Sequence, residues 1–201
     1  SRQPISTAQI IVLSEHVDYW DHDGWKDPFS SAALTERQGE YERKLGLGDV
    51  YTPQMILNGA TVISLAHKDK VEQAFEDANT APAVSVRIAS AAVDSGQPGI
   101  LRGRVEADAN PREHGNVYVV TALGQADTQV LKGENGGHHL SYVGVVQNIT
   151  QIGKLEKGKS FARDFTVKLK AGTDPKNLRV IAFVQASGFG KVIGAAMQKG
   201  L

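Results

Sequence analysis

Residues 161–169 read FARDFTVKL, and this stretch decides how the larger part of the chain is interpreted. Its large apolar residues, Phe161, Phe165, Val167 and Leu169, lie at odd positions and alternate with polar ones. Successive side chains of a β-strand point to opposite faces of a sheet, so a period of two predicts a strand with one buried face. The same alternation in residues 84–88 predicts a second strand of this kind.

Other apolar runs on both sides of this stretch predict further strands, at residues 100–107, 116–123, 129–132, 178–185 and 191–197. Turn-forming pairs such as Asn110-Pro111 and Gly136-Gly137 separate them. About seven or eight short strands in roughly 120 residues are typical of an antiparallel sandwich of immunoglobulin-like size. We therefore predict an all-β sandwich over residues 82–201.

Residues 1–80 differ from this pattern because they mix helix and strand signals. The apolar run Gln9–Ser14 predicts a strand buried on both faces, as in a parallel sheet. A helix is expected from about residue 30 to 45, with Ser30 or Ser31 as its cap and Gly46 as its stop. Pro82 follows this region and disfavours helix before it, so we place a domain boundary there.

A hairpin and a second helix complete the first region. Asn58-Gly59 is a strong two-residue turn signal between the apolar runs 55–57 and 61–63. Apolar residues then recur at the spacing of an amphipathic helix, at Val71, Ala74, Phe75 and Ala78. The predicted order is strand, helix, hairpin and helix, which indicates an α/β domain over residues 1–80.

Chemically versatile side chains gather directly after the first predicted strand, at His16, Asp18, Tyr19, Trp20, Asp21 and Trp25. In open α/β sheets, ligands bind just beyond the carboxyl ends of strands. Three interpretations are open: a structured loop in which Asp side chains cap turns, a ligand-binding surface, or a metal site. A calcium loop does not fit, because the EF-hand pattern would put Tyr19 at its first ligand position.

Thr52 and Pro53 stand immediately before the apolar run 55–57. Proline has no N–H and cannot pair inside a strand, so a cis Thr52-Pro53 bond that turns the chain sharply is one solution. These two residues belong to the candidate site only through the family resemblance given below. His138 and His139 are not added, because neighbouring residues on a strand face opposite sides and cannot easily chelate together.

Composition restricts the function further. The 22 basic and 22 acidic side chains balance, which argues against a nucleic-acid binder. No apolar stretch approaches the roughly 18 residues of a membrane span. The absence of cysteine excludes disulfides, thiolate nucleophiles and cysteine-bound metals within this chain. Phosphate-binding loops and nucleophile elbows are missing too, so we assign no cofactor, metal or catalytic residue, and whether the protein is an enzyme stays open.

The blocks His16–Asp21, Gly24–Phe29 and Val50–Met55 resemble the secreted, thioredoxin-like bacterial family called domain of unknown function 1223. The resemblance covers most of the chain, and the segment from His16 to Phe29 is its most specific part. It implies a thioredoxin-like domain followed by a β-domain, a secreted or periplasmic location, and a cis Thr52-Pro53 bond beside the site. It also implies an upstream Cys-x-x-Cys segment, whereas this chain begins just before the second strand and contains no cysteine.

The expected fold is therefore an incomplete thioredoxin-like α/β domain, without its first strand and helix, followed by the sandwich. One expected function is thiol–disulfide exchange in a complete form of the protein, with this cysteine-free chain inactive in redox chemistry. The alternative is a binding or adaptor module that uses the aromatic and acidic loop or the sandwich edges, and a metal-dependent hydrolase is a third option. We expect a protein or peptide partner, and a separate N-terminal segment or a second copy to fill the gap beside Ile10–Leu13.

Overall fold

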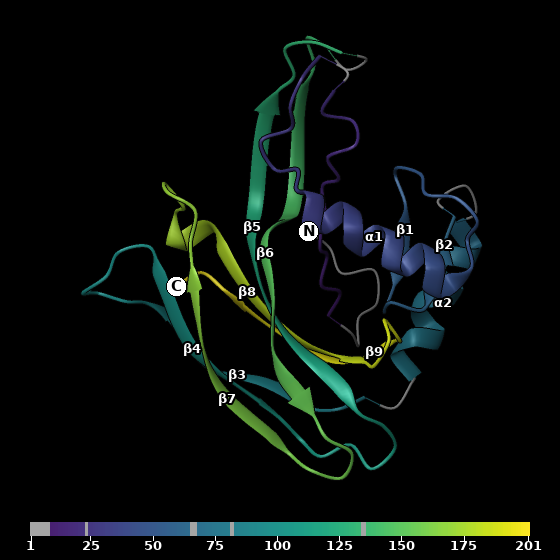
Figure 1. The fold of residues 1–201 in the computed structure, drawn as a ribbon, viewed down its shortest axis with the longest axis vertical. Helices are drawn as coiled ribbons and strands as arrows, with labels where there is room; N and C mark the ends of the chain where they lie inside the picture. The colour runs from purple at the N-terminus through teal and green to yellow at the C-terminus, as the bar shows by residue number, and fades with distance from the viewer. Residues whose placement is uncertain (1–8, 23, 65–67, 81–82, 134–135) are drawn as a thin grey trace.

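The structure, a computed structural model, describes residues 9–22, 24–64, 68–80, 83–133 and 136–201. Most of the described residues form two antiparallel sheets that pack face to face, and the N-terminal segment, α1 and a small hairpin lie on the outer side of one of them (Figure 1). The predicted β-sandwich is thus confirmed.

The three-stranded sheet has the order β3-β4-β7, with β3 at Val86–Val93, β4 at Ile100–Ala107 and β7 at Phe161–Lys168. The four-stranded sheet has the order β6-β5-β8-β9, with β5 at Gly115–Gln129, β6 at His139–Leu155, β8 at Leu178–Ala186 and β9 at Val192–Lys199. A single 3₁₀ turn at Pro175–Asn177 precedes β8. Strands β5 and β6 are long, and their hairpin projects beyond the rest of the sandwich (Figure 1).

The main core fills the space between the two sheets. Every second residue of the facing strands points into it, and Leu101, Val105, Val117, Val119 and Leu155 have no exposed surface. Burial of apolar surface stabilises a fold by roughly 25 cal/mol per Å², so this core stabilises the contact between the two sheets.

The outer face of the four-stranded sheet is also apolar and is covered by the N-terminal region. Helix α1, Ala32–Leu45, places Leu34 on this face, and Ile11 and Leu13 pack beside it. The sheet residues that they cover are Val120, Ala122, Val146, Ile181 and Phe183. The N-terminal region and the sandwich therefore share a second, smaller core.

Several local predictions in the N-terminal region are confirmed. Helix α1 ends at Gly46, which adopts the left-handed conformation, although Ser31 at its start makes no side-chain cap bond. Strands β1, Met55–Leu57, and β2, Thr61–Ile63, form the predicted hairpin, and both residues of its Asn58-Gly59 turn have positive φ. Helix α2 spans Lys68–Thr80.

The predicted fold class, a thioredoxin-like α/β domain followed by a separate sandwich, is wrong. Within the described residues, β1 and β2 pair only with each other and no parallel sheet forms. The run Gln9–Ser14 is not a strand, and only Ser14 makes an isolated parallel bridge, to Val145 of β6. The physical reason is that Ile11 and Leu13 bury their side chains against the four-stranded sheet instead of lying within a sheet of their own.

A glycine in β6 permits this arrangement. Ser14 N–H donates to Gly144 O over 2.8 Å and Val146 N–H donates to Ser14 O over 3.0 Å. Gly144 has φ +65°, and a Cβ added there would lie 2.3 Å from Val12 O. The N-terminal run can therefore cross β6 closely only because position 144 has no side chain.

The sequence patterns did not predict β6, and they predicted that β5 ends at residue 123, whereas it continues to Gln129. The β5–β6 ladder contains two register shifts, between Val117 and Tyr118 and between Thr121 and Ala122. Such bulges change which face the following side chains occupy, so the alternation in β6 is interrupted. The predicted strand at 129–132 is instead the end of β5 and the start of a loop. The predicted boundary at Pro82 lies outside the described residues.

Candidate functional site

The loop that follows Ser14 packs between the β5–β6 hairpin and α1. His16 Nδ1 donates to Asp27 Oδ2 over 2.6 Å, and its ring lies edge-on to Tyr142 of β6 and to Phe29. Burial opposes ionisation of Asp27, but the hydrogen bonds from His16 and from the Phe29 amide outweigh it and lower the pKa of the Asp27 carboxyl. Burial, and then the charge of Asp27, raise the pKa of Tyr142.

The carboxylates of this loop organise its own backbone. Asp21 accepts hydrogen bonds from the Ser30 hydroxyl over 2.7 Å and from the Asp27 amide over 3.1 Å. Asp18 accepts from the Thr35 hydroxyl of α1 over 2.6 Å, and that hydroxyl in turn accepts from the Asp18 amide. Asp18 and Asp21 thus fold the loop and tie it to the helix, which matches the structured-loop interpretation for these two residues.

Aromatic side chains of the loop meet the segment around Pro53. The indole N–H of Trp20 donates to the Thr52 hydroxyl over 3.1 Å, and the Tyr19 and Trp20 rings are 5.5 Å apart. The Thr52-Pro53 peptide bond is cis, as expected. Four of the predicted site residues, Tyr19, Trp20, Thr52 and Pro53, are therefore brought together.

Gln38 of α1 is hydrogen-bonded to residues on both sides of this contact between Trp20 and Thr52. The Tyr19 hydroxyl donates to Gln38 Oε1 over 3.1 Å. The Gln38 amide nitrogen donates to Tyr51 O and to Gln54 Oε1 over 3.1 and 3.0 Å. Gln54 Nε2 is buried and has no hydrogen-bond partner among the described residues.

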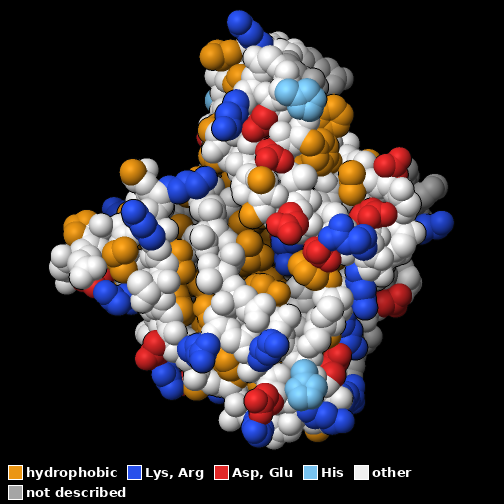
Figure 2. All heavy atoms as spheres, viewed as in Figure 1, with side chains coloured by type: hydrophobic (Ala, Val, Ile, Leu, Met, Phe, Trp, Pro, Cys, Tyr) orange, Lys and Arg blue, Asp and Glu red, His pale blue; other side chains and the backbone are white. Residues whose placement is uncertain are grey.

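We call Tyr19, Trp20, Val50, Tyr51 and Met55 the aromatic surface. Trp20 is 53% exposed and Tyr51 is 48% exposed, and Val50 and Met55 are exposed as well. Figure 2 shows apolar side chains on the projection that carries the N-terminal loop, together with acidic, basic and histidine side chains. Isolated exposed apolar residues are ordinary, but exposed Trp and Tyr side chains gathered in one place are a feature of interaction sites.

The other predicted site residues have other partners. His16 contacts Tyr142 and Phe29, and Trp25 is half-buried further along the loop. Within the described residues, no hydrogen bond or ring contact joins His16, Asp21 or Trp25 to Thr52 or Pro53. The contacts given for the predicted rim residues thus form two sets, His16 with Asp27, Phe29 and Tyr142, and Trp20 with Tyr19 and Thr52.

A buried polar network that sequence reasoning missed connects α1 to the sandwich. Arg37 is only 7% exposed, its Nε lies 3.3 Å from Glu15 Oε1, and its Nη2 donates to the Tyr41 hydroxyl over 3.0 Å. Gln185 of β8 donates to the same hydroxyl over 3.0 Å. Burial raises the pKa of Glu15, although Arg37 opposes this rise, and burial also raises the pKa of Tyr41.

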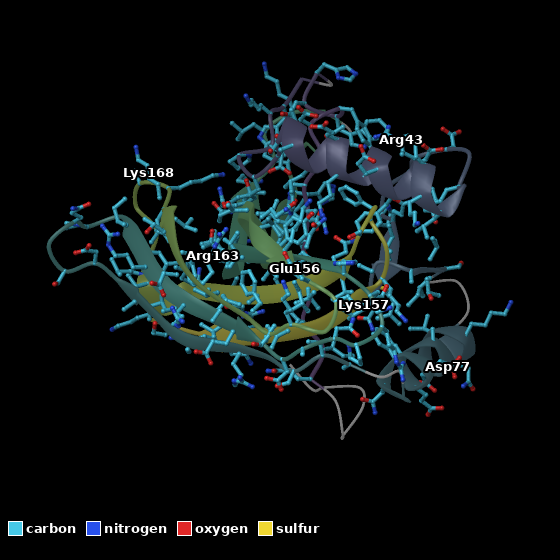
Figure 3. The ribbon with its side chains drawn as sticks, turned by 60° about the horizontal axis from the view of Figure 1, so that its bottom comes forward. Arg43, Asp77, Glu156, Lys157, Arg163 and Lys168 are labelled. Atoms are coloured by element: carbon cyan, nitrogen blue, oxygen red, sulfur yellow. The ribbon has the colours of Figure 1, made fainter. Side chains whose placement is uncertain are left out.

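Aromatic rings enclose the charged end of Arg37. Its guanidinium carbon lies 5.1 to 5.8 Å from the ring centres of Tyr41, Tyr118, Phe183 and Phe189. Such cation–π contacts are worth about 0.5–2 kcal/mol each. Figure 3 shows α1 lying across the sandwich, with side chains filling the space between them and Arg43 on the outer side of the helix. The network therefore fixes the position of the helix that carries Gln38.

The small hairpin is held against the sandwich at its turn. Val192 N–H donates to Asn58 O over 2.7 Å, and a Cβ added at Gly59 would lie 3.1 Å from Gly190 O. The start of β1 thus lies beside the aromatic surface, and its end is fixed to β9.

Two depressions lie beside α1 in the described part of the chain. A shallow depression of about 230 Å³ lies between α1 and the sheet, and one of about 120 Å³ lies near the start of α1.

Across the described ranges, no group of three or more His, Asp or Glu side chains could hold a metal ion. His139 is the first residue of β6, and its Nε2 lies 3.3 Å from Asp127 Oδ1. None of the helices described is long and apolar enough to cross a membrane.

Comparison with known proteins shows what the chain is similar to. A family model described as protein of unknown function (DUF1223) matches residues 2–185. A crystal structure of a protein from Agrobacterium tumefaciens is 24% identical with a TM-score of 0.67, and the match covers 94% of this chain and 80% of that one. This likeness shows a shared fold.

Weaker structural likenesses extend to two further proteins. The sporulation control protein Spo0M from Bacillus subtilis is 13% identical with a TM-score of 0.42, covering 60% of this chain and 49% of that one. A domain of the outer membrane lipoprotein Omp28 from Porphyromonas gingivalis is 13% identical with a TM-score of 0.37, covering 59% and 88%. No curated protein matches the chain.

Proposed function

The chain belongs to the DUF1223 family of proteins of unknown function, and we propose that it is a binding module that holds a polypeptide partner on its aromatic surface. The observation that supports this function most is the pair of half-exposed side chains Trp20 and Tyr51, of which the Trp20 indole is hydrogen-bonded to Thr52, the residue that follows Tyr51. Tryptophan and tyrosine are enriched among the residues that contribute most to protein–protein binding.

Preorganisation strengthens the proposal. Trp20 is held by Thr52, and the backbone beside Tyr51 is held by Gln38. Ordering flexible side chains opposes binding by about 0.5–1.5 kcal/mol for each one immobilised. Since part of this ordering is already present in the folded chain, a partner would lose less free energy on binding.

The roles of the other polar side chains in the N-terminal loop favour binding over catalysis. Asp18 and Asp21 accept hydrogen bonds from the hydroxyls of Thr35 and Ser30, and the His16 ring packs against Tyr142 and Phe29. Thiol–disulfide exchange stays a prediction from the family resemblance, and it would need thiols from another polypeptide because this chain has none. A location outside the cytoplasm is also part of our proposal, supported by the same resemblance.

The test is selection of a displayed library of random peptides of about twelve residues against the full chain. Affinities of the selected peptides are then measured by titration for the wild-type chain and for Trp20→Ala and Tyr51→Ala. Each variant is expected to bind about tenfold or more weakly, equivalent to about 1.4 kcal/mol or more of binding free energy.

Leu131→Ala is the matched control, because Leu131 is 74% exposed but lies in the loop of the β5–β6 hairpin. It should bind the selected peptides as the wild-type chain does. Circular dichroism of each variant checks that the fold is kept. Peptides that bind Trp20→Ala and Tyr51→Ala as tightly as the wild-type chain would place the binding surface elsewhere and refute the proposal.

A further inference from the structure

We infer that a groove beside α1 is a second binding site, and that its ligand is a short peptide of about three residues with both termini free. This inference goes beyond the proposed function, because it concerns another surface and another ligand. The shape of the groove and the opposite charges at its two ends carry it.

The groove consists of two adjoining depressions between α1 and the four-stranded sheet. One holds about 230 Å³ and the other about 120 Å³. Ala33 of α1 and Ile149 of β6 line both of them, so the depressions meet there and form one surface, which we call the α1 groove. Its further apolar residues are Phe29, Leu34 and Val146 at one end and Tyr118 and Phe189 at the other. The middle of a ligand would therefore contact apolar side chains.

One end of the α1 groove is acidic. Glu36 and Glu40 of α1 line the larger depression, and the Glu36 carboxylate makes no ion pair with any residue that the structure describes. Glu40 pairs only with Arg43, and both of these side chains are exposed. Arg37 lines the same depression, but Glu15 already balances its charge. The two glutamates therefore attract a positively charged group, such as the amino terminus of a peptide.

The other end of the α1 groove is basic and polar. Lys170 lines the smaller depression and is exposed, and its ammonium group makes no hydrogen bond or ion pair within the described ranges. Ser31, Gln147 and Asn148 line the same depression, and the Ser31 hydroxyl makes no cap hydrogen bond to α1. Hydroxyl, amide and ammonium groups all donate hydrogen bonds to a carboxylate. This end therefore suits the carboxyl terminus of a peptide.

The separation of the two ends sets the length of the ligand. Glu36 and Glu40 follow Ser31 by five and nine residues, and at about 1.5 Å per helical residue this corresponds to about 7–14 Å along α1. An extended peptide advances about 3.3 Å per residue, so about three residues bring its amino group to one end and its carboxylate to the other. A single amino acid is too short to reach both ends.

The experiment is a nuclear magnetic resonance titration of the isotope-labelled full chain with the tripeptide alanyl-leucyl-alanine. At about pH 6 the amino terminus of the peptide is protonated and its carboxylate is ionised. We expect saturable shifts of the backbone amide signals of Ala33 and Ile149. Acetylation of the amino terminus and amidation of the carboxyl terminus each remove one charge, so each should weaken binding about fivefold.

Variants connect each charge of the peptide to one end of the groove. Glu36→Gln with Glu40→Gln should weaken binding of the free tripeptide about fivefold and remove the effect of acetylation, and Lys170→Gln should do the same for amidation. Glu72→Gln in α2 and Lys168→Gln in β7 are matched controls, because both residues are exposed and lie outside the groove. Circular dichroism of each variant checks that the fold is kept.

Peptide length provides a further test. Free leucine and a hexapeptide with free termini should both bind more weakly than the tripeptide, because neither places its two charges at the two ends of the groove in an extended conformation. Affinity for the tripeptide should also fall as salt is raised.

The outcomes also separate this inference from the proposed function. The inference is overturned if millimolar tripeptide gives no saturable shifts, if the shifts lie away from the groove, or if the caps act equally on wild type and variants. Trp20→Ala should leave tripeptide binding unchanged, and a loss there would assign the peptide to the aromatic surface instead. Peptides selected from the library should bind the Glu36→Gln, Glu40→Gln variant as they bind wild type, so either proposal can fail without the other.

Discussion

At the residue scale, Asp27 links the loop to the pH dependence of stability. Its folded-state pKa lies below the ordinary 3.8 of an aspartate, so the native state binds fewer protons than the unfolded state near that pH. The resulting stabilisation is complete above the ordinary pKa and is lost as pH falls through the lowered value. Asp27→Asn should reduce the free energy of unfolding near pH 7 by about 1–2 kcal/mol.

Urea denaturation of both proteins between pH 3 and pH 7 checks this prediction. The difference in free energy between wild type and Asp27→Asn should be constant near neutral pH and should shrink below about pH 4. Glu15, whose pKa is raised, is present in both proteins, so its opposite pH dependence cancels in the difference. A difference that grows on acidification would contradict the assignment.

Gly144 provides a second prediction at this scale. Alanine at any position with positive φ costs roughly 1–2 kcal/mol, but Gly144→Ala would also bring Cβ to 2.3 Å from Val12 O. Gly158 is the control, because its φ is +76° and nothing lies within 4 Å of an added Cβ. Gly144→Ala should lower the free energy of unfolding by clearly more than Gly158→Ala, as measured by urea denaturation. Equal losses would mean that the N-terminal run does not cross β6 this closely.

At the scale of elements, Leu34 shows how α1 is held on the sheet. It is 4% exposed and belongs to the second core. Leu34→Ala should cost about 2–5 kcal/mol of unfolding free energy, whereas Leu131→Ala, at an exposed position, should change it by less than about 0.5 kcal/mol. Thermal or urea unfolding measures both, and a loss below about 1 kcal/mol at Leu34 would show that the helix is only loosely attached.

Arg37 occupies the same buried side of α1, between Leu34 and Tyr41. Arg37→Met leaves Glu15 without its partner and should destabilise the fold by about 3–5 kcal/mol, since an uncompensated buried charge is costly. The double variant Glu15→Gln with Arg37→Met should recover a large part of that loss. Chemical denaturation of the two single variants and the double variant forms the cycle, and additive losses would argue against a coupled pair.

At the scale of the whole molecule, the two cores are built from different parts of the chain. Every residue of the main core lies between Val84 and Leu201. The second core needs Ile11, Leu13 and Leu34 to cover the outer sheet face. A fragment of residues 82–201 should therefore fold as a β-protein, but with a lower melting temperature than the full chain and with an exposed apolar face.

Calorimetry and binding of a hydrophobic fluorescent dye test this expectation. The fragment should melt cooperatively and bind more dye than the full chain, because the uncovered face includes Val146, Ile181 and Phe183. A fragment without a cooperative transition would show that the two cores form one indivisible unit.

Much of the local structure could be predicted from sequence because its causes are local. The Asn58-Gly59 turn, the Gly46 stop of α1 and the alternation that predicted β3 and β7 each depend on neighbouring residues only. The proximity of Trp20 to Thr52 was also expected, and the structure confirms it. By contrast, Gln38 and Gln185 carry no pattern that would mark them, since their roles come from partners distant in the chain.

By itself, the sequence determined the sandwich, the helices and the hairpin, since the spacing of apolar side chains along a segment decides which of its faces is buried. Only the tertiary structure decided where the run Gln9–Ser14 packs, because an apolar run can bury its side chains against any apolar surface that it reaches. The long β5–β6 hairpin offered that surface, and the outer face of the four-stranded sheet buried Ile11 and Leu13. The aromatic surface follows from the same packing, which brings Trp20 to Thr52 across 32 positions of sequence.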